Sequence, residues 1–288
     1  MNSRFPLLTG VLAFLALSCA ETGCPTGGDR IELEAEMGEI RCLTRATPAT
    51  SVHDAFCVWA WVWTDERTAQ NYLCGERFTR TGTSTWKSEL PHGSVLSPYQ
   101  LQFWALSPAD APGVHGLPMS TTDGAPGFSY TTPVDPDTQT DLMAALSDVY
   151  EGMPPVVHLR FSHVLSCLQF SLDGDVPGTV VSLTVTNVCS DGRYRDGEGW
   201  TAVSAPDDFG MDGWQDCLLL IPQTLGSDAQ LRVTVEQGSG RQVLTASLAG
   251  MELPMGCRTI VRLTFPAAGS IALETSVSPW VSGPEFQE

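Results

Sequence analysis

The sequence predicts an all-β protein of two tandem β-sandwich domains with one short helix. Its 288 residues are enough for two medium-sized domains, each with its own core. Hydrophobic residues make up 42% and charged residues 17%, and the 27 Gly and 20 Pro suit many short strands joined by turns. Segments with apolar residues at alternate positions recur between these turns. We place the N-terminal sandwich at residues 30–175 and the C-terminal sandwich at residues 176–288.

The first residues predict export. One positive charge at Arg4 precedes an apolar run over residues 6–17, which is too short to span a bilayer but suits a signal peptide. Ser18 stands directly before Cys19, as in the lipobox of bacterial lipoproteins, although Ala16 replaces the usual leucine. We therefore predict a lipoprotein-type signal peptide at residues 1–18 and a lipid anchor on Cys19. An ordinary cleaved signal is the alternative.

Export changes the interpretation of the cysteines. Eight remain after Cys19, an even number that predicts disulfides in an oxidising compartment and leaves their connectivity open. No two have the C-x-x-C spacing, so we expect no structural zinc site. The disulfide candidates are Cys24, Cys42, Cys57, Cys74, Cys167, Cys189, Cys217 and Cys257.

The first sandwich opens with residues 30–45, where the odd positions from Ile31 to Met37 are apolar and predict an early strand. Residues 56–64 are apolar on both faces, which is typical of a strand buried on both sides. Three tryptophans in line on one of these faces could also form a sugar-stacking platform. We favour core packing, because the opposite face is not polar. The three are Trp59, Trp61 and Trp63.

A long loop at residues 109–140 and a short helix at residues 141–150 come next. Leu142, Ala145, Leu146 and Val149 fall at helical spacing. Residues 156–172 then alternate as a long strand, which closes the first domain near residue 175. The apolar phase slips at residues 167–168, so we expect a bulge or bend there.

The second sandwich is predicted from about seven strand candidates separated by turn residues. They lie at residues 179–188, near Trp200, and at 217–221, 230–236, 242–248, 258–265 and 271–277.

No pattern of a catalytic, cofactor or metal site emerges, so we expect no enzyme. The five histidines are scattered, and His158 and His163 fall on opposite faces of one strand. We interpret His163 as a core histidine satisfied by the backbone. An exported hydrolase would need paired acids or a triad, and neither spacing is present. The net charge of −18 argues against nucleic acid or an anionic membrane as partner.

Two acidic segments are interpreted as solvated loops. Asp135, Asp137, Gln139 and Asp141 alternate like calcium ligands but lack the glycine and the final acid of a calcium loop. The same interpretation applies to the second group, which comprises Asp207, Asp208, Asp212 and Asp216.

Six short motifs stand out along the chain. They are Trp86 with Pro91, residues 101–108 (LQFWALSP), Asp141-Leu142, Phe161-Ser162-His163 with Leu165, residues 219–223 (LLIPQ), and Pro279-Trp280 with Gly283. In this order they resemble the fimbrillin family, the type V pilus subunits of Bacteroidota, and the resemblance covers most of residues 30–283. It implies transthyretin-like, Greek-key sandwiches, no cofactor, and a structural subunit of an adhesive surface fimbria, with an outer-membrane lipid anchor and other subunits in a homo- or heteropolymer.

The resemblance also implies assembly by strand exchange. Trypsin-like cleavage after an arginine removes the first strand, and a C-terminal strand of the next subunit fills the groove. The expected cut is Arg45-Ala46, with Arg30 and Arg41 as secondary sites. A disulfide from Cys42 would keep the severed strand tethered. The donor strand is expected within residues 268–288, through Ile271, Leu273, Val277 and Trp280.

The role as stalk, anchor or tip stays open. The alternative function is a monomeric surface lipoprotein that binds a host glycan or protein.

Overall fold

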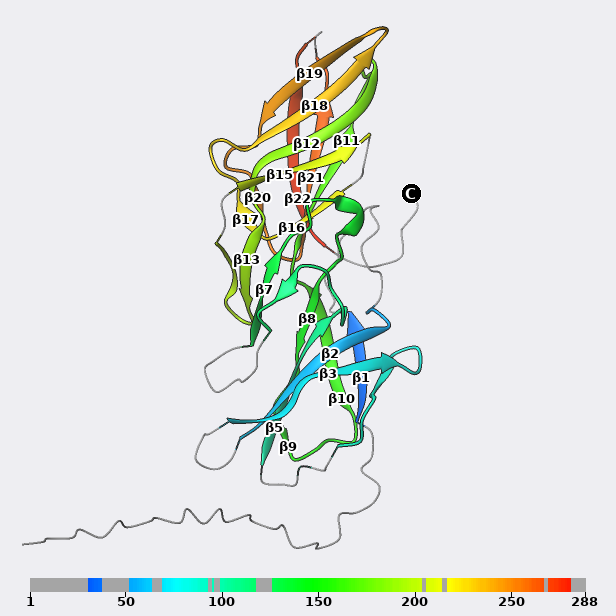
Figure 1. The fold of residues 1–288 in the computed structure, drawn as a ribbon, viewed down its shortest axis with the longest axis vertical. Coiled ribbons are helices and arrows are strands. Elements are labelled where there is room, and N and C mark those ends of the chain that lie inside the picture. The colour runs from blue at the N-terminus through cyan, green and yellow to red at the C-terminus, as the bar shows by residue number, and fades with distance from the viewer. Residues whose placement is uncertain are drawn as a thin grey trace, which may run out of the picture.

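The computed structural model describes residues 31–37, 52–63, 69–92, 95, 99–117, 126–203, 206–213, 217–266 and 269–280. These residues form strands and a single 3-10 turn, η1 (Pro136–Thr138), which confirms the all-β class. The molecule is elongated, with one group of strands at each end and a smaller group between them (Figure 1). Within the described residues, no helix is long and apolar enough to cross a membrane.

The first group of strands closes into a barrel-like ring. Its order is β2-β3-β4-β1-β10-β8-β5-β9. Because β2 also pairs with β5, the sheet closes on itself. Large apolar side chains such as Phe56, Phe78 and Phe161 fill the ring and are fully buried. The strands are β1 (Glu32–Met37), β2 (Ala55–Trp63), β3 (Ala69–Arg80), β4 (Thr85–Ser88), β5 (Gln100–Ser107), β8 (Met143–Leu146), β9 (Tyr150–Glu151) and β10 (Val157–His163).

The second group forms a sandwich of two four-stranded sheets. Their orders are β16-β11-β21-β22 and β15-β12-β18-β19. Phe170 and Leu263 from the first sheet meet Phe209 and Leu231 from the second in one core, so each sheet buries one face against the other. The strands are β11 (Ser166–Leu172), β12 (Thr179–Cys189), β15 (Pro206–Asp212), β16 (Cys217–Leu220), β18 (Gln230–Gln237), β19 (Gly240–Ser247), β21 (Cys257–Thr264) and β22 (Ala272–Pro279).

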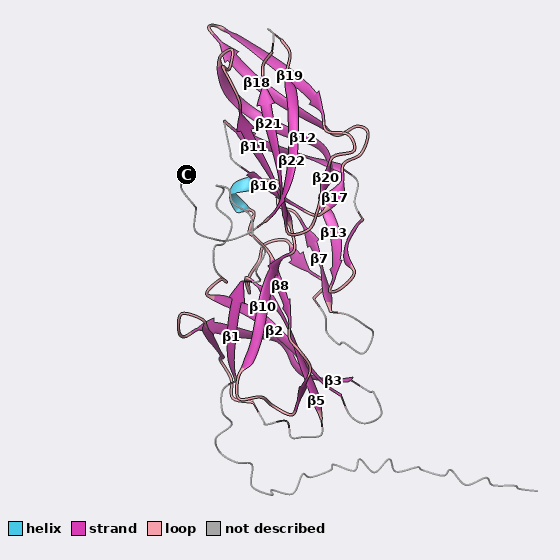
Figure 2. Ribbon diagram, turned by 180° about the vertical axis from the view of Figure 1, so that it is seen from behind, coloured by secondary structure: helices cyan, strands magenta, loops and turns pink. Residues whose placement is uncertain are grey.

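A third group of strands lies between the two ends, as both ribbon views show (Figures 1 and 2). Its main sheet has the order β14-β13-β7-β6, and a short pair, β17–β20, stands beside the sandwich. The sequence predicted only a loop where β6 and β7 lie. The strands are β6 (Val114–His115), β7 (Gly127–Thr131), β13 (Asp191–Arg195), β14 (Gly199–Ala202), β17 (Gln223–Thr224) and β20 (Glu252–Leu253).

The tryptophans of β2 belong to the junction core, and not to a sugar platform. Trp59 and Trp61 are each 3% exposed, and the Trp59 ring lies 5.0 Å from that of Trp104. They join Phe128 of β7 and Leu165 in the cluster between the two ends. Val58 and Ala60 on the opposite face of β2 are buried inside the ring. The core interpretation is therefore confirmed.

The helix expected at residues 141–150 is wrong. Residues Met143–Leu146 form β8, between β5 and β10, and a short strand β9 follows. Met143 and Ala145 face the ring core, and Leu142 and Ala144 face the junction core. Because both faces are buried, the segment has no polar alternation, and its apolar spacing fits a helix as well as a strand.

The bend in residues 156–172 lies earlier than expected. β10 ends at His163 and β11 starts at Ser166, so the chain passes from ring to sandwich at Val164-Leu165, before the expected boundary near residue 175. Cys167 and Leu168, where we expected a bulge, are regular residues of β11, and both are fully buried. Cys167 packs in the junction core and Leu168 in the sandwich core, so burial on both faces produced the apparent slip.

The second acidic segment is only partly a loop. Asp207, Asp208 and Asp212 lie exposed in β15, where Phe209 and Met211 alternate with them and point into the sandwich core. The solvated interpretation holds for these carboxylates, but the loop assignment is wrong. Asp216 lies outside the described residues.

Candidate functional site

The first strand occupies an interior position in the ring. β1 pairs in parallel with β10, where Leu33 stands opposite Val157, and in antiparallel fashion with β4, where Leu33 stands opposite Trp86. Leu33 is fully buried, and Ile31 and Ala35 are nearly so. The predicted alternation is confirmed over residues 31–37. Without β1, β4 and β10 would lose their shared neighbour and the ring core would open.

Backbone groups at the start of β1 are also satisfied by β4 and the turn before it. The Ile31 N–H donates to the Ser88 hydroxyl at 3.2 Å, and the Ser88 N–H donates to the Ile31 carbonyl at 3.2 Å. The Ala35 N–H donates to the Ser84 carbonyl at 3.1 Å. These bonds hold the β4 edge of β1 near both ends of the strand, which fixes its register against β4.

The outer face of β1 carries three glutamates, each paired with a base on a neighbouring strand. Glu32 lies 2.9 Å from Lys87 Nζ on β4. On β10, His158 Nδ1 lies 3.2 Å from Glu34, and Arg160 Nε donates to Glu36 at 2.8 Å. The strand is therefore apolar inward and anionic outward.

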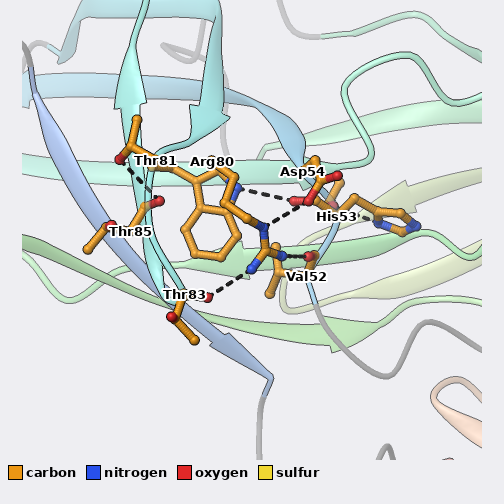
Figure 3. Close-up of polar contacts among 9 residues, drawn as sticks. Val52, His53, Asp54, Arg80, Thr81, Thr83 and Thr85 are labelled. Carbon is orange, nitrogen blue, oxygen red and sulfur yellow. Dashed lines mark hydrogen bonds and ion pairs between the residues drawn. The ribbon is translucent and has the colours of Figure 1, made fainter.

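The chain that follows the expected cut has its own attachment to the ring. Arg80 makes an ion pair with Asp54, Nε to Oδ1 at 2.9 Å, and donates to the carbonyls of Val52 and Thr83, the latter at 2.8 Å (Figure 3). The guanidinium also lies over the Trp86 ring, 4.4 Å from its centroid. Arg80 thus joins residues 52–54 to the β3–β4 hairpin without using β1.

His53 lies in this same region and is partly buried. Its carbonyl accepts the Trp86 indole N–H at 3.1 Å, and its ring Nδ1 lies 2.9 Å from the Ser107 hydroxyl. Burial lowers the pKa of His53, against the opposing effect of the Asp141 and Asp54 carboxylates. The lowered pKa favours the neutral imidazole, which lies against the Ser107 hydroxyl.

The last strand is an edge strand with little burial. Among the described strands, β22 pairs only with β21, and most of its side chains are exposed. Of the predicted donor residues, Ile271 and Leu273 are partly buried against the sandwich core, whereas Val277 is 52% exposed. The aliphatic residues of the predicted donor face are thus held weakly in this subunit.

Trp280 differs from the rest of the last strand. It is 1% exposed, and its ring stacks on His163 with centroids 4.4 Å apart and planes 4° apart. The backbone N–H of Trp280 donates to the Gly256 carbonyl at 2.7 Å. The end of β22 is therefore anchored in the junction core of its own subunit.

His163 is a core histidine, but the partner predicted for it was wrong. Its Nδ1 lies 2.8 Å from Asp141 Oδ2, and both side chains are about 95% buried. The carboxylate comes from the segment before β8, and β8 pairs antiparallel with β10, so residues 22 positions apart become neighbours. Sequence spacing could not identify this contact, because it depends on the strand pairing.

The acidic segment at residues 135–141 is only partly a solvated loop, because Asp141 is buried beside His163. Asp135 caps η1 by accepting the Asp137 N–H at 3.0 Å. Gln139 donates to the Pro133 carbonyl at 2.9 Å and accepts the Leu219 N–H at 2.8 Å. Among the residues with described positions, no three His, Cys, Asp or Glu side chains form a candidate metal site.

Several predicted site residues cannot be placed. Cys19, Cys24, Cys42, Arg45 and Ala46 all lie outside the described residues. The first strand and the predicted donor strand lie in different parts of the molecule: β1 belongs to the ring and β22 to the sandwich. A single subunit therefore does not place its last strand beside its first.

Sequence reasoning missed the three bases that face β1, namely Lys87, His158 and Arg160. The available signal was the alternation of glutamate and apolar residues from Ile31 to Met37. It indicated a charged outer face, but the bases could be assigned only once β4 and β10 were known to flank the strand.

Comparisons with known proteins match most of the chain. A family model described as fimbrillin-like matches residues 44–280. A putative cell adhesion protein from Bacteroides uniformis is 18% identical, with a TM-score of 0.61 over 90% of this chain and 100% of that one. A second, from Bacteroides ovatus, is 16% identical, with a TM-score of 0.62 over the same shares. No curated protein sequence matches.

At these identities the two solved structures show a shared fold and nothing more. The family model carries the assignment, because residues 44–280 include every described strand from β2 to β22; β1 precedes the matched residues. Members of that family are structural fimbrial subunits and not enzymes. This chain belongs to the fimbrillin-like family.

Proposed function

We propose that this chain is a subunit of a cell-surface fimbria, assembled by removal of its first strand and insertion of a strand from the next subunit. The observation that carries the proposal is the position of β1. It lies between β4 and β10, it buries Leu33 completely, and it precedes the expected cut at Arg45. Removing an interior strand leaves two unpaired edges and an apolar groove, a structure that favours strand addition.

The donor is the C-terminal segment at residues 268–288. Three aliphatic side chains lie in or next to β22: Val277 is exposed, and Ile271 and Leu273 are partly buried against the sandwich core. Burying three exposed aliphatic side chains contributes on the order of 5–9 kcal/mol before ordering costs, and the gain here is smaller by the burial that Ile271 and Leu273 already have. Trp280, buried in its own junction, serves better as an anchor at the base of the donor than as a groove contact.

The test is trypsin treatment of the purified precursor, followed on gels as SDS-resistant ladders. We expect ladders from the unaltered chain, and a loss of most polymer for Arg45→Ala and for deletion of residues 271–288. Arg241→Ala is the matched control, because Arg241 is an exposed arginine on the β18–β19 hairpin. Each sample is run with and without reductant, since a disulfide from Cys42 would retain the severed strand.

Unchanged polymer yield in both altered chains would contradict strand exchange at these positions. It would favour the alternative, a monomeric surface lipoprotein that binds a host glycan or protein. If Arg41→Ala or Arg30→Ala abolishes the polymer and Arg45→Ala does not, cleavage occurs at that other arginine and strand exchange still holds.

We also propose the lipid anchor on Cys19 and at least two disulfides in the mature chain. One disulfide pair is suggested by β11 and β16, where Cys167 and Cys217 stand two register positions apart on adjacent antiparallel strands. A hydrogen bond between the two thiols, together with burial, raises the pKa of Cys167. The six cysteines of the described residues carry no disulfide in this structure.

Intact mass measurement of protein taken from the cell envelope tests both modifications. We expect a chain that begins at Cys19 with added acyl mass, and thiol alkylation of at least four cysteines only after reduction. In Cys167→Ser the thiol of Cys217 should become alkylated without reductant, and in Cys217→Ser the thiol of Cys167 should. A mass without acyl groups would exclude the anchor, and full alkylation without reductant would exclude the disulfides.

A further inference from the structure

The outer face of β1 suggests which strand can replace it. Glu32, Glu34 and Glu36 stand at alternate positions, and each is paired with a base on β4 or β10 at 2.8–3.2 Å. Bases are scarce in this chain, with 15 Lys and Arg against 33 Asp and Glu. Lys87 is the single lysine of the sequence. Three bases on the two strands that flank β1 are thus a specific feature of the groove.

The strand pairing places these bases on both sides of β1. Glu34 stands opposite His158 and Glu36 opposite Arg160 in the parallel pair with β10, while Glu32 stands opposite Lys87 in the antiparallel pair with β4. Directly opposed side chains on neighbouring strands are close enough to interact, and opposite charges there favour pairing.

When β1 leaves, the groove presents an apolar floor and three bases along its outer rim. We propose that the strand that fills it comes from a different subunit and carries carboxylates at alternate positions, in the pattern of β1. This inference rests on the proposed strand exchange. Glu and Asp side chains would restore the ion pairs, whereas a neutral strand would leave the bases without partners and a basic strand would be repelled.

The chain's own donor segment lacks this pattern. If Ile271, Leu273 and Val277 face the groove floor, the outward positions are Ala272, Glu274 and Ser276, with one carboxylate in place of three. The acids in residues 268–288 are Glu274, Glu285 and Glu288, and no two of them are two positions apart. A second copy of this chain therefore fits the groove less well than an acidic donor, which favours a heteropolymer.

Peptide competition on the full-length chain tests the proposal. The purified protein is cut with trypsin under reducing conditions and incubated with labelled peptides that compete with β1. One peptide has the sequence of residues 31–37, a second has its three glutamates replaced by glutamine, and a third has the sequence of residues 271–277. We expect the acidic peptide to bind at least about tenfold more tightly than the other two, because its carboxylates stand opposite Lys87, His158 and Arg160.

Two further measurements separate charge recognition from general strand binding. Raised salt should shrink the preference, because exposed charges are screened. The preference should also disappear in the double variant Lys87→Gln/Arg160→Gln and persist in the control Arg193→Gln/Arg241→Gln, in which two exposed arginines elsewhere are changed.

The outcomes that overturn the proposal differ from those that overturn the exchange itself. Equal binding of the acidic and glutamine peptides would refute charge recognition and leave strand exchange intact. Equal binding of the acidic peptide and the 271–277 peptide would refute the preference for a different subunit. If no peptide binds after β1 has been released, no exchange groove exists, and both this inference and the proposed function fail.

Discussion

Replacing Trp280 with alanine is expected to lower the free energy of unfolding by about 3–5 kcal/mol, the range for a fully buried aromatic side chain. The ring is 1% exposed and stacks on His163, which itself contacts Asp141 in the junction core. The substitution leaves a cavity at the point where the last strand is anchored. Urea unfolding followed by circular dichroism measures the change, because the fluorescence signal of Trp280 itself is lost.

Two further variants serve as controls for the Trp280→Ala result. Val277→Ala lies on the same strand but changes a side chain that is 52% exposed, so we expect a loss below about 1 kcal/mol. Trp280→Phe keeps an aromatic ring against His163 and should recover part of the loss. A Trp280→Ala variant no less stable than Val277→Ala would show that the tryptophan does not anchor β22.

Replacing Leu33 with alanine is expected to cost about 2–5 kcal/mol, the range for a fully buried leucine. Leu33 is 0% exposed and stands between Trp86 and Val157 at the centre of the ring. Because the lost contacts are those between β1 and the ring, the severed strand should also leave faster after trypsin cleavage. Urea unfolding of the uncut chain and the rate of ladder formation measure the two effects.

Glu36→Ala is the matched control on the same strand. Its carboxylate is 63% exposed and pairs with Arg160 at the surface, so we expect a change below about 1 kcal/mol. Slower ladder formation in Leu33→Ala than in the unaltered chain would contradict the assignment of β1 as the strand that leaves.

Local pattern alone was enough to predict the strands with one polar face. Residues 31–37 alternate strictly and form β1, and residues 230–236 fall within β18, whose buried residues are Leu231, Val233 and Val235. In these strands the burial period is two, and the sequence shows that period directly. The all-β class and the outward carboxylates of β1 follow from such patterns.

Strands buried on both faces were assigned less well from their own residues: residues 56–64 were predicted as such a strand and form β2, but two other segments were misassigned. Met143–Leu146 was predicted as a helix, and the slip at Cys167-Leu168 as a bulge, because both segments are apolar on each face. Only the tertiary structure shows that these segments lie between two cores. The contact of Asp141 with His163 and the three bases beside β1 likewise depend on strand order. Residues brought together by non-local pairing have no fixed spacing in the sequence, which is why pattern analysis could not find them.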